Sequence, residues 1–215
     1  TSFDIPDSVT KICDGAFSGC SQLKSIEIPD RVTNIGHAIF RDCSSLVSVK
    51  LPSGATSIGS IAFYNCTSLT TVAIPTSVTE IEGYTFYNCR SLAFIELPGK
   101  ITSIGDSAFE SCVNLTTVTI PSTVTTIGSR AFYNCANLKS ITIPQSVTSI
   151  GTNAIPQNGG LTIYGVKGSY AQTYAESIGV PFSSEKTAMP TKSTVYVDGK
   201  AVAFEAYYID GNNYF

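Results

Sequence analysis

Cysteine is the residue in this chain best suited to nucleophilic, redox or metal chemistry, but its spacing favours a structural role. Six of the seven cysteines recur every 23 residues, each three residues after a phenylalanine. They are Cys20, Cys43, Cys66, Cys89, Cys112 and Cys135. Metal-binding or redox-active thiols usually share a motif with a second thiol or a histidine. The pattern instead predicts a buried column of free thiols that behave as small hydrophobes. Disulfides along the column are the alternative, because a bridge accepts Cα separations of about 4.4–6.8 Å.

The other reactive side chains stand at repeat positions whose residue type varies. Cys13 lies where most repeats carry glycine, and His37, the single histidine, lies where others carry Asp, Ser, Gly or Thr. Paired carboxylates can hydrolyse glycosides, but Glu27, Asp42 and Glu96 have polar neighbours and are expected to be solvated surface charges. We find no nucleophile elbow, zinc-binding helix, phosphate-binding loop or Cys-x-x-Cys motif. The sequence therefore predicts no enzyme, no catalytic residue, no cofactor and no metal site.

A 23-residue repeat positions all these side chains. Its period is marked by Pro6, Pro29, Pro52, Pro75, Pro98, Pro121 and Pro144. The clearest copy spans residues 120–144, IPSTVTTIGSRAFYNCANLKSITIP. Periods of about 20–50 residues are typical of solenoids, in which each unit buries its apolar side only by stacking on its neighbours. The predicted fold class is a repeat solenoid, which favours a binding scaffold over an active-site cleft.

Each repeat contains two segments with the pattern of a short strand. The first, L-x-x-I-x-I, alternates apolar and polar residues as a half-buried strand does, and the following proline ends its pairing. The second, V-T-x-I-G, is rich in β-branched residues, and we expect its glycine to permit the next bend. The A-F-x-x-C segment places two apolar side chains on one side of a 3₁₀ or short helical turn. We expect stacked parallel strands joined by such turns.

The array is expected to end after residue 158 and to be followed by a helix. Ile155 replaces the phenylalanine there, and Asn158 replaces the cysteine. Ser169 is a suitable N-cap residue, and Gly179 suits the C′ position. The predicted buried face of this helix consists of Tyr170, Ala171, Tyr174, Ala175 and Ile178.

One polar column of the repeat is occupied by threonine throughout. Its members are Thr10, Thr33, Thr56, Thr79, Thr102, Thr125 and Thr148. Such a column can donate hydrogen bonds between repeats and pack its methyl groups against the next layer, and we favour this structural role. The alternative is a regular hydroxyl array that binds an ordered lattice such as ice or crystalline polysaccharide, but the neighbouring column is mixed in residue type.

The polar positions of the first strand segment form a surface, the strand face, on which we expect a ligand to bind. Small hydroxyl residues dominate it, but Phe94 stands where the other repeats carry Ser or Thr. An exposed aromatic residue can anchor a partner. Thr71 and Thr117 flank it in the adjacent repeats, and Glu96 and Lys50 share a neighbouring column. These five residues are the predicted ligand-binding site. The alternative is that the C-terminal tail or a neighbouring molecule covers Phe94.

Three repeats carry a tyrosine and an asparagine directly after the core phenylalanine. The tyrosines are Tyr64, Tyr87 and Tyr133, and the asparagines are Asn65, Asn88 and Asn134. Aromatic rings beside amides suit carbohydrate, but half-buried tyrosines that brace a turn are the favoured interpretation.

The repeat resembles the BspA-type leucine-rich repeat family, whose pattern L-x-x-I-x-I-P-x-x-V-x-x-I-x-x-x-A-F-x-x-C is matched from residue 3 to about residue 165. Residues 161–182 resemble the terminal cap of such arrays. The resemblance implies a leucine-rich repeat array on a bacterial cell surface or in secreted form. It also implies adhesion to an extracellular or host protein, another cell or a glycan. The alternative is a structural spacer or targeting domain for another domain of a larger polypeptide, an enzyme included.

The expected domains are the array with its cap at residues 1–182, a linker at 183–192 and a β-hairpin at 193–215. The linker is polar and interrupted by proline, and an Asp198-Gly199 turn between alternating segments predicts the hairpin. The hairpin resembles the start of a β-rich module related to the amino-terminal domain of copper amine oxidases. So short a segment cannot bury a core alone, so we expect a truncated second module.

Composition excludes several partners. Only 13% of residues are charged, the net charge is −3, and no run of Lys or Arg could follow a phosphate backbone. Nucleic acid is therefore not expected as a partner. No segment approaches the roughly 18–20 apolar residues needed to cross a bilayer, so no direct membrane insertion is expected. Neither a signal peptide nor an anchor stands in these residues, and the cell-surface or secreted location follows from the resemblance.

Overall fold

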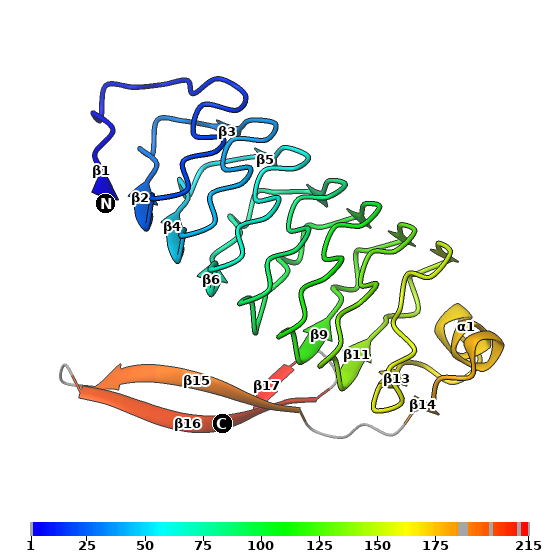
Figure 1. The fold of residues 1–215 in the computed structure, drawn as a ribbon. Coiled ribbons are helices and arrows are strands. Elements are labelled where there is room, and N and C mark those ends of the chain that lie inside the picture. Colours follow the sequence, from blue (N-terminus) through cyan, green and yellow to red (C-terminus); the bar gives the residue numbers. More distant parts are fainter. Residues whose placement is uncertain (1, 185–188, 198–199, 210–211, 215) are drawn as a thin grey trace. The chain divides into compact units, whose positions relative to one another are not determined.

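The computed structural model describes residues 2–184, 189–197, 200–209 and 212–214. It divides into two units, Thr1–Ser183 and Ser184–Phe215. In the first unit the chain coils through one turn per repeat, and successive turns stack in sequence order from β1 to α1 (Figure 1). This parallel arrangement confirms the predicted solenoid.

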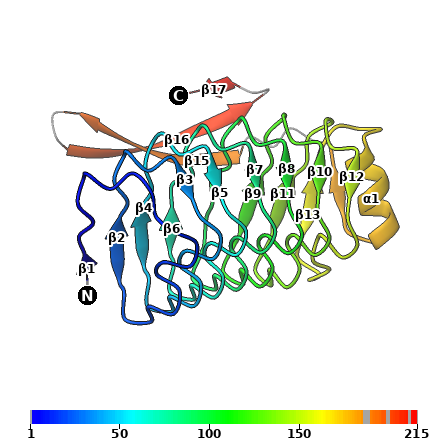
Figure 2. The ribbon, with the colours of Figure 1, turned by 90° about the horizontal axis from the view of Figure 1, so that it is seen from above.

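The first strand segment forms parallel sheets along one side of the coil (Figure 2), except in the repeat that contains residues 93–97, where the expected strand is absent. One sheet contains β1 (Ser2–Phe3), β2 (Ser25–Glu27), β4 (Ser48–Lys50) and β6 (Thr71–Val72). Another contains β9 (Thr117–Thr119), β11 (Ser140–Thr142), β13 (Thr162–Tyr164) and β14 (Phe182–Ser183). Residues one period apart pair, as Ser25 does with Ser48 and Thr117 with Ser140. The hydrophobic alternation therefore sets the register, because a slip of one residue would turn every side chain to the opposite face.

The second strand segment forms shorter parallel sheets, as expected. One sheet pairs β3 (Asn34–Ile35) with β5 (Ser57–Ile58). The other contains β7 (Glu80–Ile81), β8 (Ser103–Ile104), β10 (Thr126–Ile127) and β12 (Ser149–Ile150). In each strand the isoleucine is buried and the residue before it is not. The expected strand at Val9–Ile12 is absent from the described structure, and the prediction is wrong for that first repeat.

The A-F-x-x-C segments form successive tight turns rather than a 3₁₀ or α-helix. The Cys43 amide donates to the Phe40 carbonyl oxygen at 3.1 Å, as a three-residue turn requires. However, Ala38 and Asp42, which lie two residues either side of Phe40, have φ angles of 52° and 60°. The left-handed region cannot continue a right-handed helix, so the helical expectation is corrected. The equivalent Ile61 has a φ of 62°, which is a strained value for a β-branched residue.

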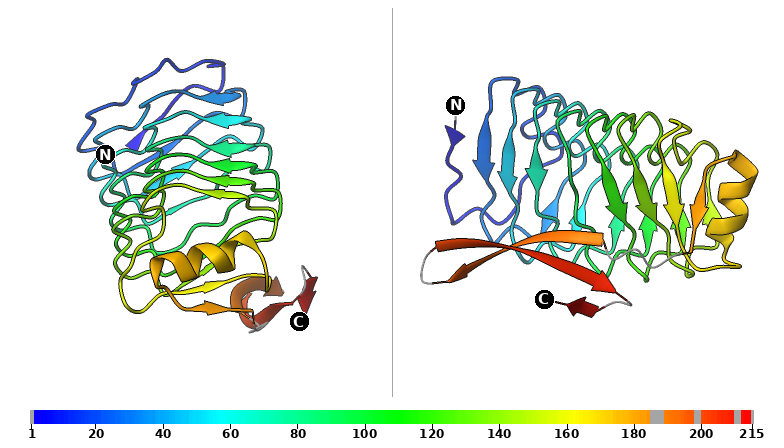
Figure 3. Two further views of the ribbon diagram at one scale, coloured as in Figure 1. Left: turned by 90° about the vertical axis from the view of Figure 1, so that its right-hand side faces the viewer. Right: turned by 90° about the horizontal axis from the view of Figure 1, so that it is seen from below.

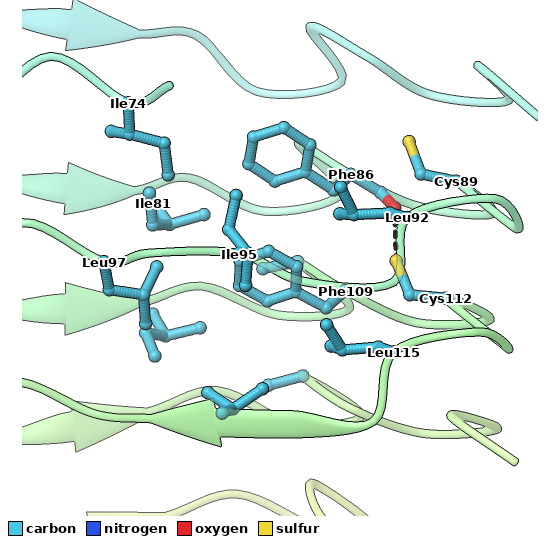
Figure 4. Packing of buried hydrophobic residues seen from close by; sticks show 14 of the residues in the cluster. Ile74, Ile81, Phe86, Cys89, Leu92, Ile95, Leu97, Phe109, Cys112 and Leu115 are labelled. Carbon is cyan, nitrogen blue, oxygen red and sulfur yellow. Dashed lines mark hydrogen bonds between the residues drawn. The ribbon is translucent and has the colours of Figure 1, made fainter. Parts of the chain in front are cut away.

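The core is a set of columns in which identical side chains stack. The rings from Phe17 to Phe132 lie 5.2–5.5 Å apart between centroids of successive repeats. Figure 4 shows Phe86 and Phe109 stacked beside Leu92, with the Cys112 thiol directed at the Phe86 carbonyl oxygen at 3.2 Å. Contacts of this kind bury each repeat against its neighbours, as a solenoid requires.

The cysteine column behaves as predicted, apart from its first member. All seven cysteines are free. Burial raises the pKa of the Cys43 thiol to about 11 and that of Cys135 to about 12, so both stay neutral. Cys20 is exposed, because it lies in the first repeat of the stack.

The glycine that ends the second strand segment serves close packing, not a special bend. A Cβ atom on Gly59 would lie 2.7 Å from the His37 backbone nitrogen, and one on Gly151 would lie 2.3 Å from that of Ser129. Neither glycine has a positive φ. The prediction that this glycine permits a bend is therefore wrong. The glycine instead lets the backbones of neighbouring repeats approach each other. Cys13 can occupy this position because it lies in the first repeat. The described chain has no earlier turn whose backbone its Cβ atom would meet.

The threonine column links the repeats, as expected. The Thr102 hydroxyl donates to the Thr79 carbonyl oxygen at 3.0 Å, and the Thr125 hydroxyl donates to that of Thr102 at 3.4 Å. The same pairs are joined by backbone hydrogen bonds of 2.8 and 2.9 Å. The column is thus a ladder within the structure.

The cap helix α1 (Tyr170–Ile178) lies across the end of the array (Figure 3). Ala171 and Ala175 are buried, and Tyr174 and Ile178 pack partly against the core. Tyr170 is 43% exposed, so its predicted place on the buried face is wrong. One helical position separates Tyr170 from Ala171, which is enough rotation to turn its ring outward.

The ends of α1 match the sequence pattern in part. Gly179 has a φ of 69°, and its amide donates to a carbonyl oxygen of the last turn, which confirms its C′ role. Ser169 stands at the N-cap, but its hydroxyl makes no capping bond and is buried without a partner in the described structure. The Gln172 side chain accepts from the Gly168 amide at 2.8 Å instead.

The second unit is an antiparallel sheet in the order β15 (Met189–Val197), β16 (Lys200–Ile209) and β17 (Asn212–Tyr214). β15 begins within the stretch expected to be a linker. The predicted Asp198-Gly199 turn and residues 185–188 of that linker lie outside the described residues. The interpretation of this unit as the start of a truncated module stays a prediction.

Candidate functional site

Phe94 is the most exposed large hydrophobic residue of the described chain, at 61%. The 23-residue register places Thr71 and Thr117 at the equivalent positions of the adjacent repeats, and both are accessible to solvent. Glu96, two residues further along, is exposed on the same face. The solenoid therefore presents four of the five predicted site residues on neighbouring positions of one surface.

Lys50 is the predicted site residue that lies apart. Its ammonium contacts the Glu27 carboxylate, with both side chains about two-thirds exposed. The hydrogen bond to Glu27 raises the pKa of Lys50. Glu27 and Lys50 also line a shallow depression of about 350 Å³ over β1, β2 and β4. Two repeats separate Lys50 from Glu96 in their shared column, so Lys50 stands at the margin of the surface around Phe94.

The strand ladder is interrupted at the repeat that carries Phe94. No strand is assigned to residues 93–97, and β6 and β9 on either side belong to different sheets. The Thr116 amide still donates to the Ala93 carbonyl oxygen at 3.3 Å. Ile95 and Leu97 remain buried, so the core continues unbroken beneath the interruption. Phe94 therefore projects from a rigidly packed layer whose surface backbone groups are less completely paired than those of its neighbours.

The surface around Phe94 is weakly polar, with Glu96 close to the ring and the pair of Lys50 and Glu27 at the margin. Val47 is 43% exposed, and Ala73 and Ala93 are exposed as well. Glu96 and the pair of Lys50 and Glu27 supply the nearby charges within these columns. An apolar centre with a charged rim is the usual organisation of a protein-binding surface.

A second surface, the turn edge, consists of the residues that directly follow each core phenylalanine. They are Ser18, Arg41, Tyr64, Tyr87, Glu110 and Tyr133. The Tyr64 and Tyr87 rings stack with centroids 4.6 Å apart, and Tyr84 lies 5.9 Å from Tyr87. The Asn88 amide donates to the Asn65 side chain at 2.9 Å. These contacts support the interpretation that this part of the edge braces the turns.

Glu110 replaces tyrosine on the turn edge and is buried, with a side chain 7% exposed. Nε and Nη2 of Arg130 donate to its two carboxylate oxygens at 3.0 and 2.5 Å. Burial raises the pKa of Glu110, but hydrogen bonds from Arg130 and Ser107 outweigh it and hold that pKa below its usual value. The Arg130 guanidinium also lies 4.1 Å from the centre of the Tyr133 ring. Sequence reasoning missed this pair, because the partners belong to different columns of adjacent repeats.

Arg130→Ala should lower the midpoint temperature of unfolding by several degrees at pH 7, because it leaves a buried carboxylate without its partner. The folded-state pKa of Glu110 is lowered, so the pair stabilises the fold at neutral pH and loses its effect as the pH falls through that pKa. The difference between variant and wild type should therefore shrink at about pH 3. Thermal unfolding followed by circular dichroism at both pH values measures this.

Arg41→Ala is the matched control, because Arg41 also contacts an acidic side chain, Asp42, but both are largely exposed. Exposed ion pairs contribute little, so this variant should unfold near the wild-type temperature. Equal destabilisation by the two substitutions would contradict the claim that Arg130 stabilises the fold because its partner, Glu110, is buried.

The single histidine of the chain has one side-chain contact among the described residues. His37, which is exposed, contacts the Ser60 hydroxyl through Nδ1 at 2.8 Å. Within the described residues no group of three or more His, Cys, Asp or Glu side chains could hold a metal ion. Among the helices that the structure describes, none is both long and apolar enough to cross a membrane.

Comparison with known proteins identifies the repeat as a leucine-rich repeat. The family described as "BspA type Leucine rich repeat region" matches in six copies, over residues 1–112 and 33–162. No curated protein matches the chain significantly. A leucine-rich repeat protein of T. pallidum is 23% identical, with a TM-score of 0.46 and 85% of each chain covered.

Two other solved structures are similar over less of their own length. A leucine-rich repeat protein from Bacteroides ovatus is 28% identical, with a TM-score of 0.49, and the match covers 77% of this chain and 55% of that one. The pneumococcal vaccine antigen PcpA is 18% identical, with a TM-score of 0.50, and the match covers 86% of this chain and 42% of that one. The PcpA match supports the fold alone.

Proposed function

The chain belongs to the BspA-type leucine-rich repeat family, and from that premise we propose that it is a cell-surface or secreted recognition module that binds a protein or a glycan through the strand face around Phe94. Repeats of this family generally mediate protein interactions and are typically not catalytic. Binding of this kind needs no reactive group, only a stable surface with an anchor that a partner can bury.

The observation that carries the proposal is the exposure of Phe94 in a column of the strand face that otherwise carries Ser or Thr. Leaving a large aromatic side chain 61% exposed forgoes the stabilisation that its burial would give. A partner that covers the ring would recover it. Aromatic side chains that insert into a partner commonly supply most of the binding energy of an interface.

The neighbours of Phe94 suit the surround of such an anchor. Thr71 and Thr117 offer hydroxyl groups on either side, and Glu96 offers a carboxylate that can fix the orientation of a partner. Lys50, paired with Glu27, contributes a charge at the rim. Rim charges mainly affect the rate of association and its dependence on salt, so we assign Lys50 a steering role and Phe94 the anchoring role.

The alternative is a structural spacer, and the uniformity of the remaining strand face favours it. The column that contains Phe94 otherwise carries Ser or Thr in every repeat from Ser25 to Ser140. A spacer needs only such a regular surface, with no anchor. The two functions therefore differ in whether Phe94 has a partner.

Binding to a panel of extracellular-matrix proteins and glycans tests the proposal. We expect saturable binding of the wild-type chain to at least one member, and Phe94→Ala should weaken it about thirtyfold, which corresponds to about 2 kcal/mol. Surface plasmon resonance on each immobilised ligand gives the affinity. The substitution should change the free energy of unfolding by less than about 0.5 kcal/mol, because the side chain is exposed.

Tyr170→Ala provides the matched control, since Tyr170 is an exposed aromatic residue on the cap helix, 43% accessible. It should leave binding unchanged. Binding that survives Phe94→Ala would move the site away from this surface, and absence of binding to every ligand would favour the spacer.

A further inference from the structure

A pocket of about 320 Å³ lies where the turn edge of the array meets the cap helix. It is formed by the repeats around Tyr133 and Asn153, and by Tyr174 and Ile178 of α1. None of these residues belongs to the strand face. Its volume is at the lower end of the roughly 300–1,000 Å³ range of small-molecule sites.

The pocket exists because the last repeat departs from the pattern. Pro156 and Gln157 follow Ile155 where the five preceding repeats carry a tyrosine or charged residue and then Asp, Asn or Ser. The Gln157 Nε2 donates to the Ile178 carbonyl oxygen at 2.9 Å, which ties this repeat to α1. Asn158, in the cysteine column, donates to the Leu138 carbonyl oxygen at 2.8 Å. The walls are thus fixed by one hydrogen bond between the array and its cap and by another between two repeats of the array.

The lining combines aromatic rings with amide groups that still have free hydrogen-bonding capacity. Asn134 donates through Nδ2 to the Ser111 hydroxyl at 3.1 Å. In the part of the chain that the structure describes, its Oδ1, the Oε1 of Gln157 and the side chain of Asn153 have no partner. The Tyr133 ring is 40% exposed beside them. Burial raises the pKa of Tyr174, so its ring carries no charge.

No Asp, Glu, Lys, Arg or His is among the described residues that line the pocket. The cation beside the pocket, Arg130, lies over the Tyr133 ring but is already bound by both oxygens of Glu110. Among the described residues that line the pocket, a phosphate, sulfate or carboxylate ligand would therefore find no free positive charge, and burying an unpaired anion is costly. The lining favours a neutral ligand.

We propose that this pocket binds a neutral pyranose sugar as a second recognition site, separate from the strand face. A pyranose ring has an apolar face of C–H groups that can pack on a tyrosine ring, and hydroxyl groups that both donate and accept. The amides of Asn134, Asn153 and Gln157 provide complementary donors and acceptors at the same opening. A site with aromatic walls and a few oriented polar groups is the common organisation of small-molecule pockets.

Saturation-transfer difference NMR with neutral sugars tests this site. The probes are galactose, glucose, mannose, N-acetylglucosamine, N-acetylgalactosamine and their common disaccharides, with glucuronic acid and sialyllactose as charged comparisons. We expect saturable binding of at least one neutral probe and weaker binding of the charged ones. Tyr133→Ala and Gln157→Ala should each lower the affinity about tenfold, and both should remain folded because the two side chains are exposed.

Tyr64→Ala is the internal control: it removes a turn-edge tyrosine three repeats away that does not line the pocket, and it should leave sugar binding unchanged. The inference is overturned if no neutral sugar binds saturably, if both pocket variants bind like the wild type, or if a charged sugar binds more tightly.

Discussion

Phe109→Ala is expected to lower the free energy of unfolding by about 3–5 kcal/mol, the usual cost of removing a buried phenylalanine side chain. Phe109 is fully buried and stacks on both Phe86 and Phe132, at 5.2 and 5.3 Å. Its loss leaves a cavity that touches two interfaces between repeats at once. In a solenoid each repeat is stabilised mainly by its two neighbours, so the cavity weakens the contacts on which the array depends.

Urea denaturation followed by far-UV circular dichroism measures this loss. Phe94→Ala is the matched control, because it makes the same chemical change on a ring that is 61% exposed. The control should change stability by less than about 0.5 kcal/mol. Similar losses for the two variants would contradict the assignment of Phe109 to the core and Phe94 to the surface.

A single residue inserted after Thr102 is expected to break the array at that repeat and abolish cooperative unfolding of the whole unit. β8 pairs in parallel with β7 and β10, so Ser103 and Ile104 are held in register on both sides. The insertion turns Ile104 toward solvent and a polar residue toward the core, because side chains alternate between faces. It also separates Thr102 from its backbone partners in the adjacent repeats.

The control is the same residue inserted after Gly159, in an exposed loop where a Cβ on either Gly159 or Gly160 would meet nothing within 4 Å. Loops of this kind tolerate insertions. Differential scanning calorimetry should show one cooperative transition for the control. The variant with the insertion after Thr102 should show a lower and broader transition, or two. Identical transitions would contradict the stacked-ladder arrangement.

The periodic features of the fold could be predicted from the sequence, because each depends on contacts between equivalent residues. The burial of Phe63 and Cys66, the register of both strand sets and the threonine ladder follow from the 23-residue spacing alone. The array also ends where Ile155 replaces phenylalanine. Repetition makes such predictions robust, since every repeat tests the same assignment.

The features that the sequence did not predict correctly depend on backbone conformation and on the distance between neighbouring backbones. The spacing of residue types determines neither. The A-F-x-x-C segment after Gly36 suggested a helical turn, but Ala38 and Asp42 have positive φ angles, which a right-handed helix cannot contain. The glycine at position 59 is required by the backbone of the preceding repeat rather than by its own bend.

The candidate sites were predictable to different degrees. Phe94 could be identified because the other repeats carry Ser or Thr at its position. Its exposure follows from the alternation of buried and exposed residues along the strand segment. The pocket beside α1 was not predicted, because it depends on where the cap helix meets the last repeat. The Glu110 and Arg130 pair was missed for a similar reason, since its two members are 20 residues apart rather than one period.

Hydrogen–deuterium exchange on the chain, free and bound to the matrix protein or glycan with the highest affinity in the binding screen, tests the central claim most directly. The account predicts that the ligand slows exchange in residues 70–74, 93–97 and 116–119, with the largest change at 93–97, where the ladder is interrupted. These peptides contain the strand-face residues around Phe94. Protection confined to the turn edge or to α1, with no change at residues 93–97, would show that the strand face is not the recognition surface.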